Sequence, residues 1–243
     1  MDEKLYLKIL SDLREIDYRG ILTYSRYNEP FADRIILKRL QQAKEYLPNA
    51  ILYTHSNGDY LNKEYLDEIG DAGLMVLKWQ HYLREDEEFI IDNIIEKMKA
   101  NIKRLNLEYC DIKTCPTCVS MKIKHDKIDI EYVATDFREF GCTRGDTLTT
   151  IKAYDRKSPC YIPFGALYID YNGLVMPCCN LRSDIKEHEN YIMGDTNKES
   201  LSEIFTSKKI VNLRKALIGN DKKPAPCDTC KFGTWKTIKD VEI

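Results

Sequence analysis

The sequence contains no apolar run of about eighteen residues, the length that a membrane-spanning helix needs, and its first residues, Met1-Asp2-Glu3-Lys4, carry charges that a secretory signal would not have. We therefore expect no membrane contact. Neither sign of charge dominates, because 37 Lys and Arg oppose 39 Asp and Glu. A chain without a basic excess has no electrostatic footprint for nucleic acid, so we expect no nucleic-acid partner. Nine cysteines without a signal segment predict the reducing cytoplasm.

Helices and short strands are predicted to alternate over the first half of the chain. With 243 residues, 43% of them hydrophobic, the chain can form one large or two small domains. Apolar residues recur at helical spacing in four segments: 6–16, 36–47, 66–69 and 91–105. Strand-like apolar runs lie between them at 20–24, 50–54 and 74–79. This order predicts a parallel sheet whose strands end at one edge, where ligands bind in open α/β sheets and barrels.

Two polar loops come directly after the first two predicted strands, at 25–30 and 55–61. A carboxylate such as Glu29 at a strand end can hold a ligand ammonium group, and Pro30 stiffens the turn. The alternative is a solvated turn without a ligand. The four histidines stand singly, without a spaced carboxylate or cysteine partner, so we expect packing or surface roles for all of them: His55, His81, His125 and His188.

Four cysteines in the last third form the most informative pattern: Cys160, Cys178, Cys227 and Cys230. The segment between the first two predicts a β-hairpin, because Asn172-Gly173 supplies the positive backbone dihedrals of a tight two-residue turn. Such a hairpin returns Cys160 and Cys178 to one end. The later Cys-x2-Cys pair can hold adjacent corners of one metal centre, so four thiolates can converge.

Spacing alone does not decide what these cysteines hold. Two disulfides would need an oxidising compartment, which the chain's opening does not indicate. Four cysteines in two groups suit a structural zinc ion as well as an iron–sulfur cluster, although the long gap in the first group is unusual for a zinc knuckle. The metal stays open between iron and zinc at this point.

Five further cysteines raise a second question. Cys115 and Cys118 have the spacing of a metal or redox pair, and Cys110 lies near them in sequence. Together with Cys142 they either form a second metal site or serve as packing and loop residues. Cys179 adjoins Cys178, but successive strand residues face opposite sides, so we expect only one of the two to face a cluster.

The first half resembles the radical S-adenosylmethionine (SAM) barrel family. The resemblance rests on segments that look like the second and third strand–loop units of that barrel: 20–30, 56–61 and 71–73. It implies contacts to SAM from Glu29, which would bind the amino group of the cofactor, from Asn57, and from Gln80, near the ribose.

The last third resembles the SPASM or shorter Twitch auxiliary domain. Val175-Met176-Pro177-Cys178-Cys179-Asn180, Gly194-Asp195, Leu201-Ser202-Glu203-Ile204-Phe205 and the four cysteines carry this resemblance. It implies iron rather than zinc, with Cys178 rather than Cys179 as ligand. Because no cysteine comes after Cys230, it implies one auxiliary 4Fe-4S cluster. The expected fold is α/β: a partial (β/α)6 barrel over 1–150 and a hairpin-plus-helix cluster domain over 151–243.

Two features depart from the family pattern. Arg26 and Asn28 stand where the family has glycines before the acid, so only Glu29 and Pro30 carry over. The Cys-x3-Cys-x2-Cys motif that holds the SAM-cleaving cluster is absent, and the opening helix matches the helix that the family has immediately after that motif. We therefore expect an N-terminally shortened member, or a misplaced start. A cluster with four protein thiolates offers no open iron for SAM, so these residues alone should not cleave it.

For an extended version, the resemblance implies a 5′-deoxyadenosyl radical that modifies a peptide or carbohydrate, with flavodoxin or ferredoxin as electron donor. The alternative is a non-catalytic module, holding Fe-S or Zn, that binds a substrate or partner through the former barrel mouth.

Overall fold

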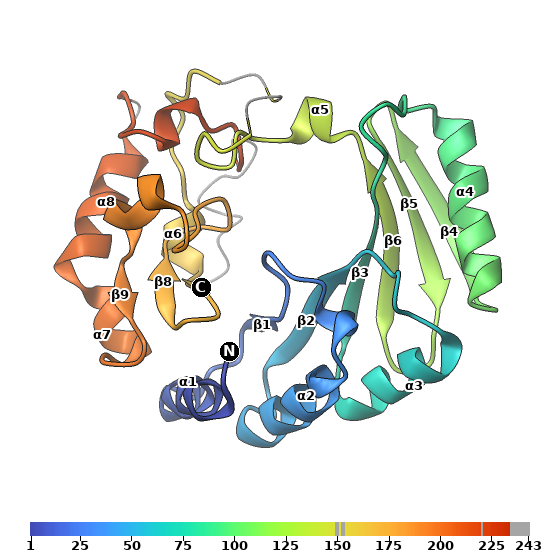
Figure 1. Ribbon diagram of the computed structural model, residues 1–243, viewed down its shortest axis with the longest axis horizontal. Helices are drawn as coiled ribbons and strands as arrows, with labels where there is room; N and C mark the ends of the chain where they lie inside the picture. The colour runs from blue at the N-terminus through green and yellow to red at the C-terminus, as the bar shows by residue number, and fades with distance from the viewer. Residues whose placement is uncertain (149–150, 152–153, 220, 234–243) are drawn as a thin grey trace. The chain divides into compact units, whose positions relative to one another are not determined.

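The computed structural model describes residues 1–148, 151, 154–219 and 221–233 (Figure 1). Within these ranges no helix combines the length and the apolar character that crossing a bilayer requires. Contacts between Cα atoms divide the chain into two units, one of residues 13–139 and one of residues 1–12 and 140–243. The sequence analysis places residues 1–12 in the first domain, whereas in the structure they group with the C-terminal part.

The unit of residues 13–139 is built on a six-stranded sheet in the order β1-β2-β3-β6-β5-β4. Its strands are β1 (Ile21–Thr23), β2 (Ile51–Ser56), β3 (Val76–His81), β4 (Glu108–Cys115), β5 (Cys118–Lys124) and β6 (Asp129–Thr135). The pairs β1–β2, β2–β3 and β3–β6 are parallel, as the alternation of helices and strands predicts. The polar loops 25–30 and 55–61 therefore leave the sheet at the same edge.

The two strands at the β4 end of the sheet, β4 and β5, depart from the barrel pattern. β4 and β5 form an antiparallel hairpin, and β5 pairs antiparallel with β6. A hairpin needs only a short turn, whereas a parallel neighbour needs a crossover, so this part of the sheet contains no helix between strands. Four parallel strands with an antiparallel extension give the partial barrel.

Helices cover one face of this sheet (Figure 1). They are α2 (Ile35–Tyr46), α3 (Lys63–Ala72) and α4 (Ile91–Arg104). The 3-10 turn η1 (Pro30–Ala32) precedes α2, and the short α5 (Phe137–Phe140) follows β6. In α4 the buried residues Ile94, Met98 and Ile102 recur every four positions, so one stripe of the helix packs inward. Asn62 caps α3 by accepting from the Tyr65 N–H, and Gly73 ends it with a φ of 114° that favours glycine.

The second unit begins with residues 1–12, which include most of α1 (Glu3–Glu15), and contains a small antiparallel sheet in the order β7-β8-β9. Its strands are β7 (Tyr168–Ile169), β8 (Leu174–Met176) and β9 (Gly194–Asp195), and its further helical segments are α6 (Ile162–Gly165), α7 (Leu201–Thr206), α8 (Lys208–Ile218), η2 (Lys186–Tyr191) and η3 (Cys227–Thr229). Lys8 Nζ donates to the Glu199 carbonyl at 2.8 Å, and Asp12 accepts from the Leu201 N–H at 3.0 Å. These bonds explain why the first twelve residues group with the C-terminal part.

The predicted hairpin forms, but its turn differs from the prediction. Gly173 N donates to the Asp170 carbonyl at 2.9 Å, which leaves Tyr171 and Asn172 as the central turn residues. Only Gly173, with a φ of 88°, adopts the left-handed region, so the loop has three residues rather than two. Asn172 instead accepts from the Leu174 N–H through its side chain at 3.1 Å.

Candidate metal centre and cofactor-binding loops

The four cysteines of the C-terminal pattern come from three segments of one unit. Cys160 lies two residues before α6, Cys178 comes after β8, Cys227 begins η3, and Cys230 directly follows it. The hairpin β7–β8 accounts for the approach of the first two, because antiparallel strands return the chain to its starting end. All four thiols are partly buried.

Electrostatic effects between the thiols show that they lie close together. Burial raises the pKa of Cys178 well above its usual value, and the neighbouring thiols of Cys179, Cys227 and Cys160 raise it further. The pKa of Cys227 rises to about 12, first through burial and then through Cys160. A hydrogen bond with Cys142 and then burial raise the pKa of Cys230.

Thiols with raised pKa values are neutral at pH 7 and become thiolates only beside a compensating cation. The residues present therefore fit a metal group that supplies positive charge to several sulfurs at once. Among the described residues, no group of three His, Cys, Asp or Glu side chains surrounds one point closely enough for a single ion. An iron–sulfur cluster takes four cysteine thiolates as its ligands, so the chemistry of this set of residues fits that group.

In the other unit, Glu29 ties together the loops after β1 and β2. Its carboxylate accepts from the Ser56 hydroxyl at 2.7 Å and from the Asn57 N–H at 2.9 Å. It also caps η1 by accepting from the Phe31 N–H at 3.2 Å. These three bonds hold a half-buried carboxylate at the edge where the parallel strands end.

Asn57 and Gln80 have different surroundings. The Asn57 side chain bonds with Asp59, while its backbone carbonyl accepts from Trp79 Nε1 at 3.1 Å. Gln80 is 8% exposed, and its amide nitrogen donates to the neighbouring His81 carbonyl at 3.1 Å. The structure therefore joins Asn57 directly to Glu29 and gives no bond between Gln80 and either residue.

The comparisons with known proteins agree with this geometry. The model of the SPASM family, an iron-sulfur cluster-binding domain, matches residues 160–231, a range that begins at Cys160 and ends one residue after Cys230. Over the whole chain, the sequence is 20% identical to an S-adenosyl-L-methionine-dependent 2-deoxy-scyllo-inosamine dehydrogenase of Niallia circulans, covering 85% of that protein. Residues 160–231 thus match the SPASM iron–sulfur cluster-binding family, and the chain as a whole is similar to a SAM-dependent dehydrogenase.

Two solved structures share the fold of this chain. A crystal structure of BtrN in complex with AdoMet and 2-DOIA matches with a TM-score of 0.67 and 20% identity, over 95% of this chain and 80% of that one. A selenomethionine BtrN structure in an open conformation matches with a TM-score of 0.62 and 16% identity, over 98% of this chain and 86% of that one.

Within the same unit, Cys142 and Cys179 lie beside members of the four-cysteine set. Cys142 is 6% exposed and hydrogen-bonds with Cys230, an approach that sequence analysis missed because 88 residues separate them. That bond and the nearby Arg144 and Lys231 lower the pKa of Cys142 to about 6, although burial acts in the opposite direction. No spacing rule connects Cys142 to the four cysteines of the C-terminal pattern, so its contact with Cys230 could be found only from the folded structure.

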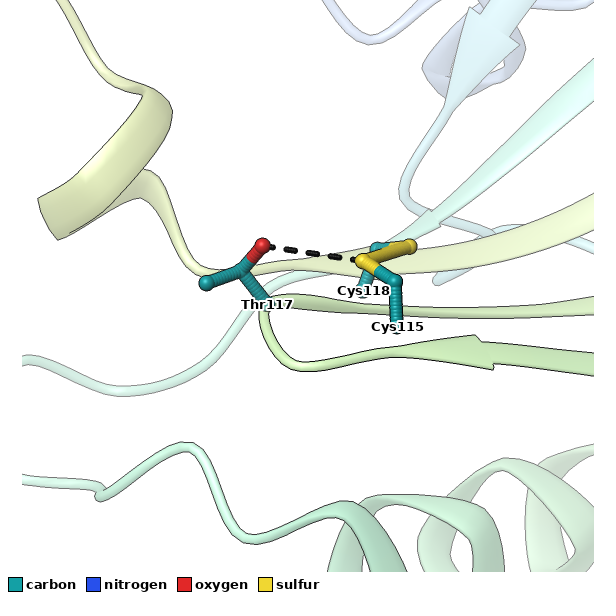
Figure 2. Close-up of a disulfide and its surroundings, with 3 residues drawn as sticks. All are labelled: Cys115, Thr117 and Cys118. Carbon is teal, nitrogen blue, oxygen red and sulfur yellow. Dashed lines mark hydrogen bonds between the residues drawn. A yellow bond between two sulfur atoms is a disulfide. The ribbon is translucent and has the colours of Figure 1, made fainter.

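Cys115 and Cys118, whose spacing suits a metal or redox pair, are joined to each other in the structure. Figure 2 shows Cys115 and Cys118 joined by a disulfide at the turn between β4 and β5, with Cα atoms 5.0 Å apart. They are cross-strand partners in the hairpin, which places them within disulfide reach. Cys110 is exposed on β4, with its thiol directed to the Lys122 carbonyl, and Cys142 belongs to the other unit.

The histidines have structural partners. His188 is fully buried, its Nδ1 accepts from the Arg182 N–H at 3.1 Å, and its Nε2 bonds the Gly145 carbonyl at 2.8 Å. His125 accepts two backbone N–H bonds from Lys127 and Ile128. His55 bonds Tyr53, and His81 bonds Tyr132.

Proposed function

We propose that this radical SAM/SPASM protein holds one auxiliary 4Fe-4S cluster on Cys160, Cys178, Cys227 and Cys230. The observation that carries the proposal is the placement of these four cysteines in one unit, where burial and then neighbouring thiols raise the pKa values of Cys178 and Cys227. The match of residues 160–231 to the SPASM family supports it. When bound, such a cluster supplies electron transfer.

We also propose that the loops after β1 and β2 bind the methionine end of SAM. Three donors hold the Glu29 carboxylate in place, and a carboxylate has further lone pairs with which it can accept a bond from the SAM ammonium group. Asn57 would fix this carboxylate through its backbone N–H. Gln80, buried at the end of β3, would contact the ribose.

The substrate class that the comparisons favour is a carbohydrate-like ring rather than a peptide. A longer relative acts on 2-deoxy-scyllo-inosamine, and the present chain matches it over its whole length. Reductive cleavage of SAM needs an iron with an open position, and the 243 residues contain no Cys-x3-Cys-x2-Cys motif for it. The proposal for these residues is therefore cluster binding and SAM recognition. A binding module without turnover is the second candidate, favoured by the same missing motif.

Metal analysis of anaerobically prepared protein tests the cluster. We expect about four irons and matching acid-labile sulfide per chain, and near-complete loss of both in a Cys227→Ala, Cys230→Ala variant. About eight irons would require a second cluster. Stoichiometric zinc without sulfide, after failed reconstitution with iron, would contradict the proposal and favour a zinc-stabilised binding module.

Replacing Glu29 with glutamine tests the cofactor loops. The variant keeps the shape but loses the charge that would bind the SAM ammonium group, and a bond to a charged group contributes about 1.5–3 kcal/mol. We expect a roughly tenfold or greater loss of SAM affinity by equilibrium dialysis. The control is Glu96→Gln, an exposed carboxylate paired with Lys99 on α4. Equal affinities in wild type and Glu29→Gln, or no binding by wild type, would contradict the assignment.

A further inference from the structure

Arg156 is a buried cation beside the cysteine centre. Its side chain is among the largest that are fully buried, with 1% of the residue exposed. The guanidinium donates to four backbone carbonyls: Ser158 at 3.0 Å, Cys230 at 3.2 Å, Phe232 at 2.6 Å and Pro159 at 2.5 Å. All of these acceptors are neutral, and no ion pair joins Arg156 to a carboxylate in the described part of the chain.

These carbonyls belong to the two segments that carry three of the proposed ligands. Ser158 and Pro159 immediately precede Cys160, while the other two carbonyls belong to Cys230 and the residue two positions after it. The Arg156 backbone N–H also donates to the Asp228 carbonyl at 2.8 Å, between Cys227 and Cys230. One side chain therefore fixes the spacing of segments that are about seventy residues apart in sequence.

The charge of Arg156 has a second consequence. Burying a cation costs several kcal/mol unless an anion compensates it, and carbonyl dipoles compensate only in part. Four thiolates outnumber the positive charge of an iron–sulfur core, so a bound cluster would supply the missing anion. Adding an electron increases that negative charge, and a nearby buried cation stabilises the reduced state most.

We propose that Arg156 is a positioning residue of the cluster site, which holds the Cys160 and Cys227–Cys230 segments together and raises the reduction potential of the bound cluster. This inference rests on the proposed cluster function. Arg156 lies four residues before Cys160 and thus outside the range that matches the SPASM family.

The test compares Arg156→Gln with wild type by EPR-monitored redox titration of the anaerobically reconstituted full chain. Glutamine keeps N–H donors but removes the charge. We expect the oxidised-to-reduced ratio at a fixed ambient potential to rise at least tenfold, equivalent to about 59 mV for a one-electron couple. Iron release to a chelator should also become faster. The matched control is Arg214→Gln, because Arg214 donates to the Pro163 and Phe205 carbonyls in the same unit.

Arg156→Lys separates the two roles, since lysine keeps the charge but lacks the planar fork. For Arg156→Lys we expect an oxidised-to-reduced ratio of the cluster within about twofold of wild type, together with faster iron release. A ratio and a release rate that match wild type in both Arg156 variants would overturn the inference, as would an equal shift in Arg214→Gln. If Arg156→Gln does not fold, Arg156→Lys decides alone, and wild-type iron release by it overturns the positioning role. A wild-type chain without iron and sulfide would instead refute the proposed function itself.

Discussion

Replacing Cys178 with alanine should reduce the iron of the anaerobically prepared protein from about four atoms per chain to near zero, whereas replacing Cys179 should leave it almost unchanged. The two residues are adjacent, similarly exposed and identical in chemistry, so the pair is a matched test of geometry. Cys178 lies within the electrostatic range of Cys160 and Cys227, and Cys230 also interacts with it. Cys179 raises the pKa of Cys178, and the effects given for Cys227 and Cys230 name other thiols.

Iron, sulfide and the visible absorption of the cluster measure this difference. A destabilised fold could also lose metal, so circular dichroism of both metal-free variants should match that of the metal-free wild type. Loss of iron in Cys179→Ala, with retention in Cys178→Ala, would reverse the assignment. Partial loss in both would indicate that the two thiols exchange as ligands.

The parallel part of the fold could be predicted because its signals are local. The apolar stripe of α4 and the left-handed Gly73 after α3 each depend on residues a few positions apart. The antiparallel β4–β5 extension could not be derived in the same way. β4 is mostly exposed on both faces, so its sequence lacks the alternation that marks a half-buried strand.

The residues of the candidate site could likewise be predicted from the sequence only where their signal is local. Spacing within the sequence identified the four cysteines, because a hairpin and a Cys-x2-Cys pair are short-range devices. Cys142 and Arg156 reach the centre through tertiary contacts and have no regular spacing from the ligands. The Glu29 loops are intermediate: position at a strand end suggested a ligand role, but only the structure shows Ser56 and Asn57 anchoring the carboxylate.

Gly58→Ala should destabilise the unit of residues 13–139 by about 2–5 kcal/mol, the sum of left-handed backbone strain and overpacking. Gly58 has a φ of 78°, and an added Cβ would lie 2.1 Å from Trp79 Nε1. Trp79 cannot easily move away. It is 2% exposed, its ring stacks on Tyr132 with centroids 3.7 Å apart, and its Nε1 bonds the Asn57 carbonyl.

Urea unfolding of the metal-free protein, followed by circular dichroism and tryptophan fluorescence, measures the change. Gly219→Ala is the control, because Gly219 has a φ of −71° and the nearest atom to an added Cβ, Asp221 Oδ2, is 3.4 Å away. That substitution should alter stability by less than about 1 kcal/mol. An unchanged unfolding midpoint in Gly58→Ala would show that the loop can move away from Trp79.

The same substitution also links stability to ligand binding. Asn57 lies between Gly58 and the Glu29 carboxylate, to which it donates its backbone N–H, and the Gly58 N–H donates to Ser56 Oγ at 2.9 Å. A shift of the 56–58 segment away from Trp79 would therefore displace Ser56 and Asn57, two of the three donors that orient Glu29. SAM affinity should therefore fall in Gly58→Ala without urea, where the unit stays folded. The Glu29 carboxylate keeps its charge but loses its fixed direction. Unchanged SAM affinity in a destabilised Gly58→Ala protein would mean that Glu29 binds the cofactor without this support.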